Sequence, residues 1–158
     1  MDPAIGKTGG CQCGAIRYEL TGSAKMLYVC HCRDCQKQSS SAFGMSLIMA
    51  RDDVGFTQGA DRLQTWNTRG DDGRIKRCVF CPECGTRIYH ASDHDDEPVS
   101  IKAGSLDDTQ WLRPVAHIWL QSAQSWLEVD HDAAPCYSGE PDDEAALARL
   151  WQQQSSHG

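Results

Sequence analysis

Seven of the nine cysteines in this 158-residue chain fall into three short groups whose spacings are typical of metal ligands. The groups are Cys11-Gln12-Cys13, Cys30-His31-Cys32-Arg33-Asp34-Cys35 and Cys81-Pro82-Glu83-Cys84. Zinc bound by four cysteines forms a closed, structural site, whereas zinc with three protein ligands keeps one position open for chemistry. The middle group, called the cysteine triplet below, is therefore the first candidate for a functional centre.

The outer pairs, Cys11/Cys13 and Cys81/Cys84, each supply half of a tetrahedral site. We expect them to share one structural zinc, because this arrangement leaves neither pair without a partner. Spacing alone leaves two other arrangements open. The triplet could borrow one outer cysteine, or the cysteines could form disulfides, although their odd number counts against disulfides.

Cys30, Cys32 and Cys35 would then hold a second zinc, and we expect these three ligands to form the catalytic centre. Three thiolates leave a net charge of −1 on such a site. Zinc still accepts a further soft ligand there and lowers the pKa of an incoming thiol. The resulting thiolate is a nucleophile at neutral pH, so the triplet favours thiol chemistry.

The alternative for the triplet is a second structural zinc that a nearby side chain completes. The candidates for that fourth ligand are His31, Asp34, Cys78 and Cys136. His31 lies between two ligands and is expected to point away from the metal, and Asp34 is expected to cap the turn that follows. Arg33 and Lys37 flank the triplet and either offset its charge or remain ordinary surface cations.

Short strands must position these cysteines, because short apolar or alternating runs are separated by turn residues along most of the chain. We predict strands at residues 15–20, 26–29, 42–50, 54–56, 63–66, 75–80, 86–90, 99–103 and 115–120, and an extended segment at 125–129. Residues 33–38 could form a turn of helix, and residues 69–73 a polar hairpin loop. Cys11 and Cys13 would stand roughly 6.5–7 Å apart in a straight strand. The backbone must therefore bend there, which Gly10 and Gly14 permit.

The C-terminal segment has a different pattern. Pro141 suits a first helical position, and the acidic residues that follow it suit a helix N-terminus. Leu147, Leu150 and Trp151 then repeat at the spacing of one helix face. We predict one short helix from about residue 141 to 153 that packs its tryptophan onto the sheet, and we expect the five tryptophans of the chain in the core.

Length and charge limit the fold and the partners. A chain of 158 residues favours a single domain over residues 1–158. The formal charge is −7 and two zinc sites with seven thiolates would bring it to about −10, so we expect no nucleic-acid binding. No apolar run approaches the roughly 20 residues of a membrane span, and Met1-Asp2-Pro3 does not begin a signal peptide. We expect a cytoplasmic protein with no membrane partner.

Together these segments resemble the glutathione-dependent formaldehyde-activating family, also called the centromere protein V/Gfa domain. The stretches that carry the resemblance are Gly10–Gly14, Cys30–Cys35 with Ser41-Ala42-Phe43, Phe80–Thr86, and Pro114–Trp119 with Trp126. The resemblance covers roughly residues 8–130. It implies a mainly β fold of the zinc-binding β-tent type, to which the short C-terminal helix is added.

The resemblance also implies two Zn²⁺ ions and a thiol substrate. A structural zinc would lie on Cys11, Cys13, Cys81 and Cys84, and a second zinc on the triplet, where the thiol of glutathione binds. The implied activity is that of a carbon–sulfur lyase: a small thiol adds to an aldehyde such as formaldehyde, or the adduct breaks down. Ser41 and Phe43 follow the triplet, and we expect them to line the pocket for the thiol.

Two other functions stay open. A non-enzymatic zinc module would carry a thiol or bind a protein partner, and would need a fourth protein ligand at the triplet. A relative of the methionine sulfoxide reductases would use Cys136 as its nucleophile. Otherwise Cys78 and Cys136 are expected to be small buried side chains, and His117 a core or pocket residue. His90 and Tyr89, which follow the last cysteine pair, could approach a substrate.

Overall fold

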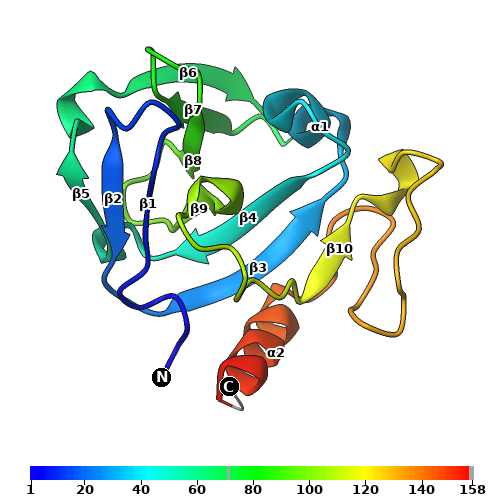
Figure 1. Ribbon diagram of the computed structural model, residues 1–158. Helices are drawn as coiled ribbons and strands as arrows, with labels where there is room; N and C mark the ends of the chain where they lie inside the picture. Colours follow the sequence, from blue (N-terminus) through cyan, green and yellow to red (C-terminus); the bar gives the residue numbers. More distant parts are fainter. Residues whose placement is uncertain (71, 157–158) are drawn as a thin grey trace.

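Ten strands form two sheets in the computed structural model, which describes residues 1–70 and 72–156 (Figure 1). The smaller sheet has the order β1-β2-β5 and consists of β1 (Thr8–Gly10), β2 (Arg17–Leu20) and β5 (Val54–Gln58). The larger sheet has the order β10-β3-β4-β9-β8-β7-β6. Its strands are β3 (Ala24–Cys30), β4 (Gly44–Met49), β6 (Gln64–Arg69), β7 (Ile75–Phe80), β8 (Arg87–Ser92), β9 (Val99–Lys102) and β10 (Ala116–Ile118).

Two α-helices accompany the sheets: α1 (Arg33–Ser39), which follows β3, and α2 (Glu144–Ser156) near the C-terminus. Four short 3-10 turns lie at Arg51–Asp53, Ala60–Arg62, Ala103–Ser105 and Leu120–Ser122. The predicted mainly β fold with a C-terminal helix is confirmed. None of the described helices combines the length and apolar character needed to cross a membrane.

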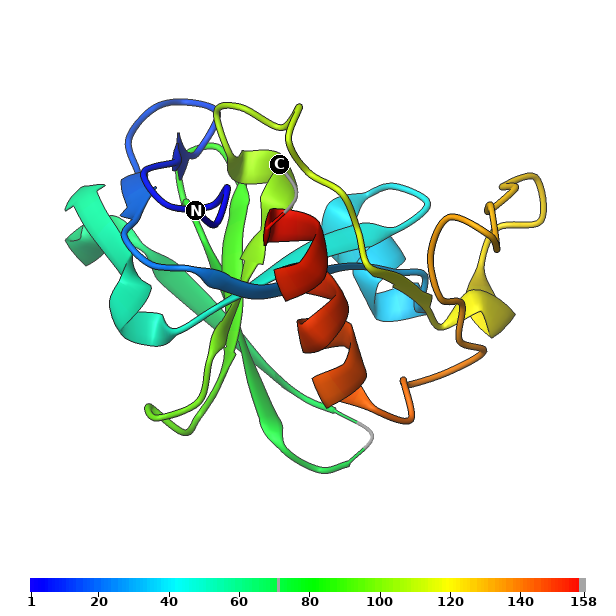
Figure 2. The ribbon, with the colours of Figure 1, turned by 90° about the horizontal axis from the view of Figure 1, so that it is seen from below.

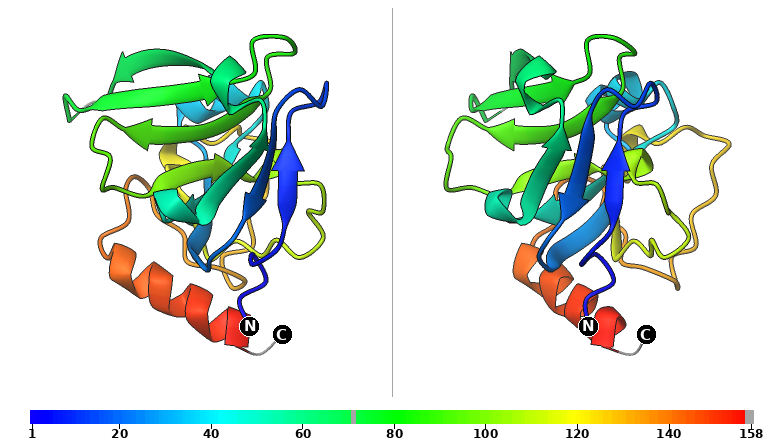
Figure 3. Two further views of the ribbon diagram at one scale, coloured as in Figure 1. Left: turned by 90° about the vertical axis from the view of Figure 1, so that its left-hand side faces the viewer. Right: turned by 60° about the vertical axis from the view of Figure 1, so that its left-hand side comes forward.

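One face of the larger sheet is apolar and packs against the smaller sheet (Figure 3). Across this face, four residues lie directly opposite one another on β3, β4, β9 and β8: Leu27, Leu47, Ile101 and Tyr89. The ring of Phe56 on β5 contacts Tyr89, with centroids 6.1 Å apart, and also contacts Tyr18 on β2, at 6.2 Å. The main core of the protein therefore lies between the two sheets.

The opposite face of the larger sheet carries the side chains that alternate with this apolar row, and several of them are polar. Lys102 on β9, Ser46 on β4 and Tyr28 on β3 lie directly opposite one another on this side. Cys30 is two residues beyond Tyr28 and lies opposite Gly44. Helix α1 follows Cys30 and lies beside the ends of β3 and β4 (Figure 1). We call this polar side the site face.

Helix α2 packs against β3 (Figure 2), with the side chains of Leu147 and Trp151 buried. The Trp151 Nε1–H donates a hydrogen bond of 2.9 Å to Asp2, near the N-terminus. The helix starts at residue 144 rather than 141, because the Asp143 carboxylate accepts a hydrogen bond of 3.0 Å from the Ala146 N–H and caps it. The placement of Pro141 at the first helical position is therefore wrong.

Two further expectations from the sequence fail on the surface. The segment 125–129 is a turn followed by irregular chain rather than an extended strand, and the Leu127 N–H donates to the Gln124 carbonyl at 3.0 Å. Trp126 is 69% exposed and Trp66 is 50% exposed, so these two tryptophans are not in the core. Strands β6 and β7 form the predicted hairpin, but Asp71 in its loop lies outside the described residues.

Candidate active site

The two outer cysteine pairs lie together, although 67 residues separate them in the chain. Cys11 and Cys13 lie in the turn between β1 and β2, and Cys81 and Cys84 in the turn between β7 and β8. The four sulfurs lie within 4.8 Å of one another, and the Sγ atoms of Cys11 and Cys13 are 3.5 Å apart. Zinc–sulfur bonds of about 2.3 Å place the sulfurs of a tetrahedral site about 3.8 Å apart, so this four-cysteine cluster fits zinc.

The turns bend where the sequence requires it. Gly14 has φ +81° and Gly85 has φ +77°, in the left-handed region that glycine adopts most readily. The Ile16 N–H donates to the Cys11 sulfur at 3.2 Å. A hydrogen bond from the Thr86 hydroxyl, helped by backbone N–H groups, lowers the pKa of Cys84 to about 6. These hydrogen bonds thus favour a thiolate at Cys84, whereas the pKa of Cys13 is raised to about 11, chiefly by the neighbouring Cys11 thiol and by burial.

The cysteine triplet is formed by the end of β3 and the start of α1. Cys30 ends the strand, Cys32 is the N-cap residue of the helix, and Cys35 lies in its first turn. Their three sulfurs lie within 4.8 Å of one another. The Cys32 sulfur accepts a hydrogen bond of 3.3 Å from the Cys35 N–H, so Cys32 caps the helix. The expectation that Asp34 caps this turn is wrong.

The three sulfurs of the triplet divide charge unequally. Hydrogen bonds from the thiols of Cys30 and Cys35 lower the pKa of Cys32 to about 2, and the same interactions, with burial, raise the pKa of Cys30. One thiolate therefore forms easily, but two more at this distance require a compensating cation. A soft divalent metal supplies that charge, so this donor set also fits zinc.

No fourth protein ligand joins the triplet among the described residues. The ring of His31 turns to His117, and the two side chains share a hydrogen bond of 3.0 Å between Nε2 and Nδ1. Cys78 is fully buried outside both clusters. Cys136 also lies outside them, and burial raises its pKa, which disfavours the thiolate that a sulfoxide reductase nucleophile needs.

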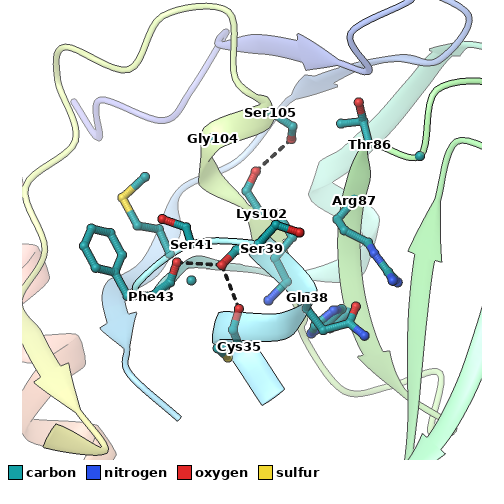
Figure 4. Close-up of a pocket in the computed structure, with 15 residues that line it drawn as sticks. Cys35, Gln38, Ser39, Ser41, Phe43, Thr86, Arg87, Lys102, Gly104 and Ser105 are labelled. Carbon is teal, nitrogen blue, oxygen red and sulfur yellow. Dashed lines mark hydrogen bonds between the residues drawn. The ribbon is translucent and has the colours of Figure 1, made fainter. Parts of the chain in front are cut away.

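A cavity of about 440 Å³ opens beside Cys35 on the site face (Figure 4). Its walls come from α1 and the loop after it, from the start of β8, and from β9 with the turn that follows. Ser41 and Phe43, expected to line a pocket, both line this one, and Gly85 and Thr86 bring it close to the four-cysteine cluster. The space is large enough for part of a small organic thiol.

Sequence reasoning missed the positive charges of this cavity. Of the described residues that line it, the lysine and arginine side chains are those of Arg87 and Lys102, and none is acidic. Burial lowers the pKa of Lys102, and the negative charge at Cys35 partly offsets that effect. Arg33 and Lys37, the flanking cations considered from the sequence, are exposed and do not line the cavity. The signal for Lys102 was the alternation of residues 99–102, which places Lys102 on the face opposite to the buried Ile101.

His90, which the sequence suggested could approach a substrate, lies at this cavity, whereas Tyr89 lies on the opposite, apolar face of the sheet. His90 is buried, it lines the cavity, and its Nε2 has no hydrogen-bond partner among the described residues. Burial first, and then the charges of Lys102, Lys76 and Arg87, lower the pKa of His90 to about 2. The imidazole is therefore neutral at physiological pH, with one nitrogen available to a ligand.

The fold and these clusters define a mainly β protein with two cysteine clusters that could hold metal ions. The family model described as glutathione-dependent formaldehyde-activating enzyme matches residues 6–122, and the chain belongs to this family. The chain is 26% identical to a Penicillium rubens protein named for the same activity, over 72% of this chain and 62% of that protein. It is 25% identical to an uncharacterised lyase of Schizosaccharomyces pombe, over 60% and 64% of the two chains. The matches thus span slightly less than two thirds of either relative.

A solved structure supports the fold. A Rhodobacter sphaeroides protein of known crystal structure superposes with a TM-score of 0.51 over 66% of this chain and 91% of that chain. The two sequences are 21% identical, so this likeness concerns the fold alone.

Proposed function

We propose that this chain is a zinc-dependent carbon–sulfur lyase-type enzyme that adds a small thiol to an aldehyde, or catalyses the reverse reaction. Glutathione and formaldehyde are the first candidates, because the family is named for them. The observation that carries the proposal is the contrast between the two clusters. Four cysteines can close one site, whereas the triplet offers three ligands beside a cavity.

Zinc held by Cys30, Cys32 and Cys35 would lower the pKa of an incoming thiol and present its sulfur as a nucleophile. The protein contributes position. Cys35 is carried by a helix and Cys30 by a strand, so the backbone of both residues is held by regular hydrogen bonds, and the cavity would hold the aldehyde beside Cys35. Such alignment of two reactants is a large source of rate enhancement.

Ser41 and Phe43 are proposed to receive the thiol compound. Phe43 offers an apolar wall, and its ring contacts His31, with centroids 5.7 Å apart. Ser41 offers a hydroxyl at the exposed rim of the cavity. A pocket with one apolar and one polar group suits a small peptide-like thiol better than it suits a purely apolar thiol.

The test is the rate at which glutathione and formaldehyde equilibrate with their adduct, measured by exchange NMR with and without the zinc-loaded protein. We expect the exchange rate to rise in proportion to protein concentration, to fall to the uncatalysed rate in Cys32→Ser, and to persist in Cys78→Ala. An unchanged exchange rate in the presence of the zinc-loaded protein would remove the enzymatic proposal. Glutathione binding without rate enhancement would favour the thiol-carrying module instead.

A further inference from the structure

The proposed reaction, on which this inference rests, creates a negative charge that needs a partner. When a thiolate sulfur bonds to an aldehyde carbon, the carbonyl π electrons move to oxygen and leave an alkoxide. That oxygen stands two bonds from the sulfur, and therefore within a few ångströms of the triplet. A preorganised hydrogen-bond donor with positive charge at this place stabilises the transition state more than the reactants.

Lys102 is held at the inner wall of the cavity by its strand. It lies directly opposite Ser46 across β9 and β4, and its Nζ donates a hydrogen bond of 3.2 Å to the Ser46 hydroxyl. Ser46 is buried and lies opposite Tyr28, two residues before Cys30. Lys102 and Cys30 are thus set on the same sheet face, with fixed register.

The side chain of Lys102 points toward Cys35 in the cavity (Figure 4). No carboxylate forms an ion pair with Lys102 among the described residues. A half-buried ammonium group without an acidic partner is costly unless something else uses its charge. An ammonium group has three N–H donors, and Ser46 accepts one, so the other two, which have no hydrogen-bond partner among the described residues, can face the cavity.

The other cations near the triplet are less well placed. Arg87 points away from Cys35 in Figure 4, and its guanidinium stacks over Phe80 at 5.3 Å. Lys37 is exposed and does not line this cavity, and neither does Lys76. Lys102 is therefore the cation that best meets the oxygen.

We propose that Lys102 is a catalytic residue whose ammonium group donates a hydrogen bond to the aldehyde oxygen as it becomes an alkoxide. The sulfur–carbon bond forms, the carbonyl π bond breaks, and the alkoxide takes a proton from water. That proton replaces the one that the thiol released to water earlier, so no other reactant is consumed. In the reverse direction the same ammonium group stabilises the alkoxide before the carbon–sulfur bond breaks.

The test compares Lys102→Met with Lys37→Met, which removes the same charge from the outside of α1, and with Lys102→Arg. Four quantities are measured: zinc content, glutathione affinity, exchange rate, and affinity for the S-sulfonate of glutathione. The S-sulfonate places negative oxygens two bonds from the sulfur, as the alkoxide does. Its affinity reports on the oxygen site independently of turnover.

We expect Lys102→Met to keep the wild-type zinc content and to bind glutathione within about threefold of wild type. It should lose about 100-fold in exchange rate and at least about 10-fold in S-sulfonate affinity. Lys37→Met should match the wild type, and Lys102→Arg should recover part of the S-sulfonate affinity.

Three results would overturn the proposal. If Lys102→Met keeps the wild-type exchange rate and S-sulfonate affinity, Lys102 has no catalytic role, and the proposed function is unaffected. Loss of zinc or of glutathione affinity in Lys102→Met would assign the lysine to charge balance at the metal site. A wild-type protein that does not accelerate exchange would remove the proposed function and this inference together.

Discussion

Gly44 on β4 leaves the space that Cys35 on α1 occupies: a Cβ at position 44 would lie 3.4 Å from the Cys35 Cβ and 3.7 Å from its sulfur. Gly44 also lies directly opposite Cys30. No side chain therefore separates the cysteine on the strand from the cysteine on the helix. The geometry of the triplet depends on a residue without a side chain as well as on its three thiols.

This relationship predicts a graded effect of side-chain size at position 44. Gly44→Ala should keep two zinc ions per chain, because 3.4 Å is an ordinary contact distance. Gly44→Leu should displace Cys35 and reduce the zinc content to one per chain, with the four-cysteine cluster retained. Gly139→Leu is the matched control, since a Cβ there meets nothing within 4 Å. The zinc content of each variant is measured by plasma emission spectroscopy. Two zinc ions per chain in Gly44→Leu would contradict the close packing of Gly44 against Cys35.

The two clusters should differ in their contribution to stability. The four-cysteine cluster joins the β1–β2 turn to the β7–β8 turn, and so ties distant parts of the chain, whereas the triplet ties only six consecutive residues. Cys84→Ser should lower the free energy of unfolding by more than about 3 kcal/mol. Cys35→Ser should lower it by less than about half of that, while it abolishes thiol binding. Denaturant unfolding of the zinc-loaded proteins measures both, and equal losses would be inconsistent with one structural and one functional site.

His90 predicts a specific dependence of stability on pH. Its pKa is lowered to about 2 in the folded protein, from an ordinary value of about 6.5. Below pH 6.5 the unfolded chain binds a proton that the folded protein does not, so the folded state loses stability as the pH falls. Between pH 7.5 and 5.5 the wild type should lose about 1 kcal/mol more than His90→Gln.

The exposed His94 provides the control for this comparison. His94→Gln removes a histidine whose side chain is 62% exposed, so it separates the loss of a buried histidine from the loss of any histidine. Denaturant unfolding at each pH gives the free energies. Parallel curves for the wild type and His90→Gln would show that His90 accepts a proton in the folded state.

The cysteine clusters and most strands could be predicted from the sequence, because these features depend on residues that are close together in the chain. The spacing Cys81-Pro82-Glu83-Cys84 and the alternation in residues 15–20 depend on neighbours in the chain, so both could be read directly. The face on which a lysine lies depends instead on strand pairing. Lys102 belongs to the site only because β9 lies beside β4, a neighbour distant in sequence.

The position of Arg87 also depends on strand pairing and could not be predicted from the sequence. One extra residue in β8 shifts the register between β7 and β8, so that Arg87 pairs with Phe80. This bulge places Arg87 on the face of His90, where simple alternation would put it on the opposite face. The predicted start of α2 was wrong for a different reason. Pro141 and Asp143 both suit a helix N-terminus, and it is the Asp143 carboxylate that caps the helix.

Two tryptophans provide a test of the packing of α2. Trp151 is 2% exposed, its ring contacts Trp111 with centroids 6.4 Å apart, and its Nε1–H donates to Asp2. Trp151→Ala should cost about 3–5 kcal/mol of unfolding free energy. Trp126→Ala, at a position 69% exposed, should change it by less than about 0.5 kcal/mol. Similar losses in the two variants would mean that α2 does not pack on β3 in solution.

The triplet is proposed to hold zinc with a fourth position open to a thiol. Zinc X-ray absorption on the protein with two zinc ions tests this proposal most directly. Four sulfurs on one zinc and three on the other predict a mean of about 3.5 sulfurs per zinc, which should rise to about 4 when glutathione is added. A mean that is already 4 without thiol, or one that glutathione leaves unchanged, would contradict the account.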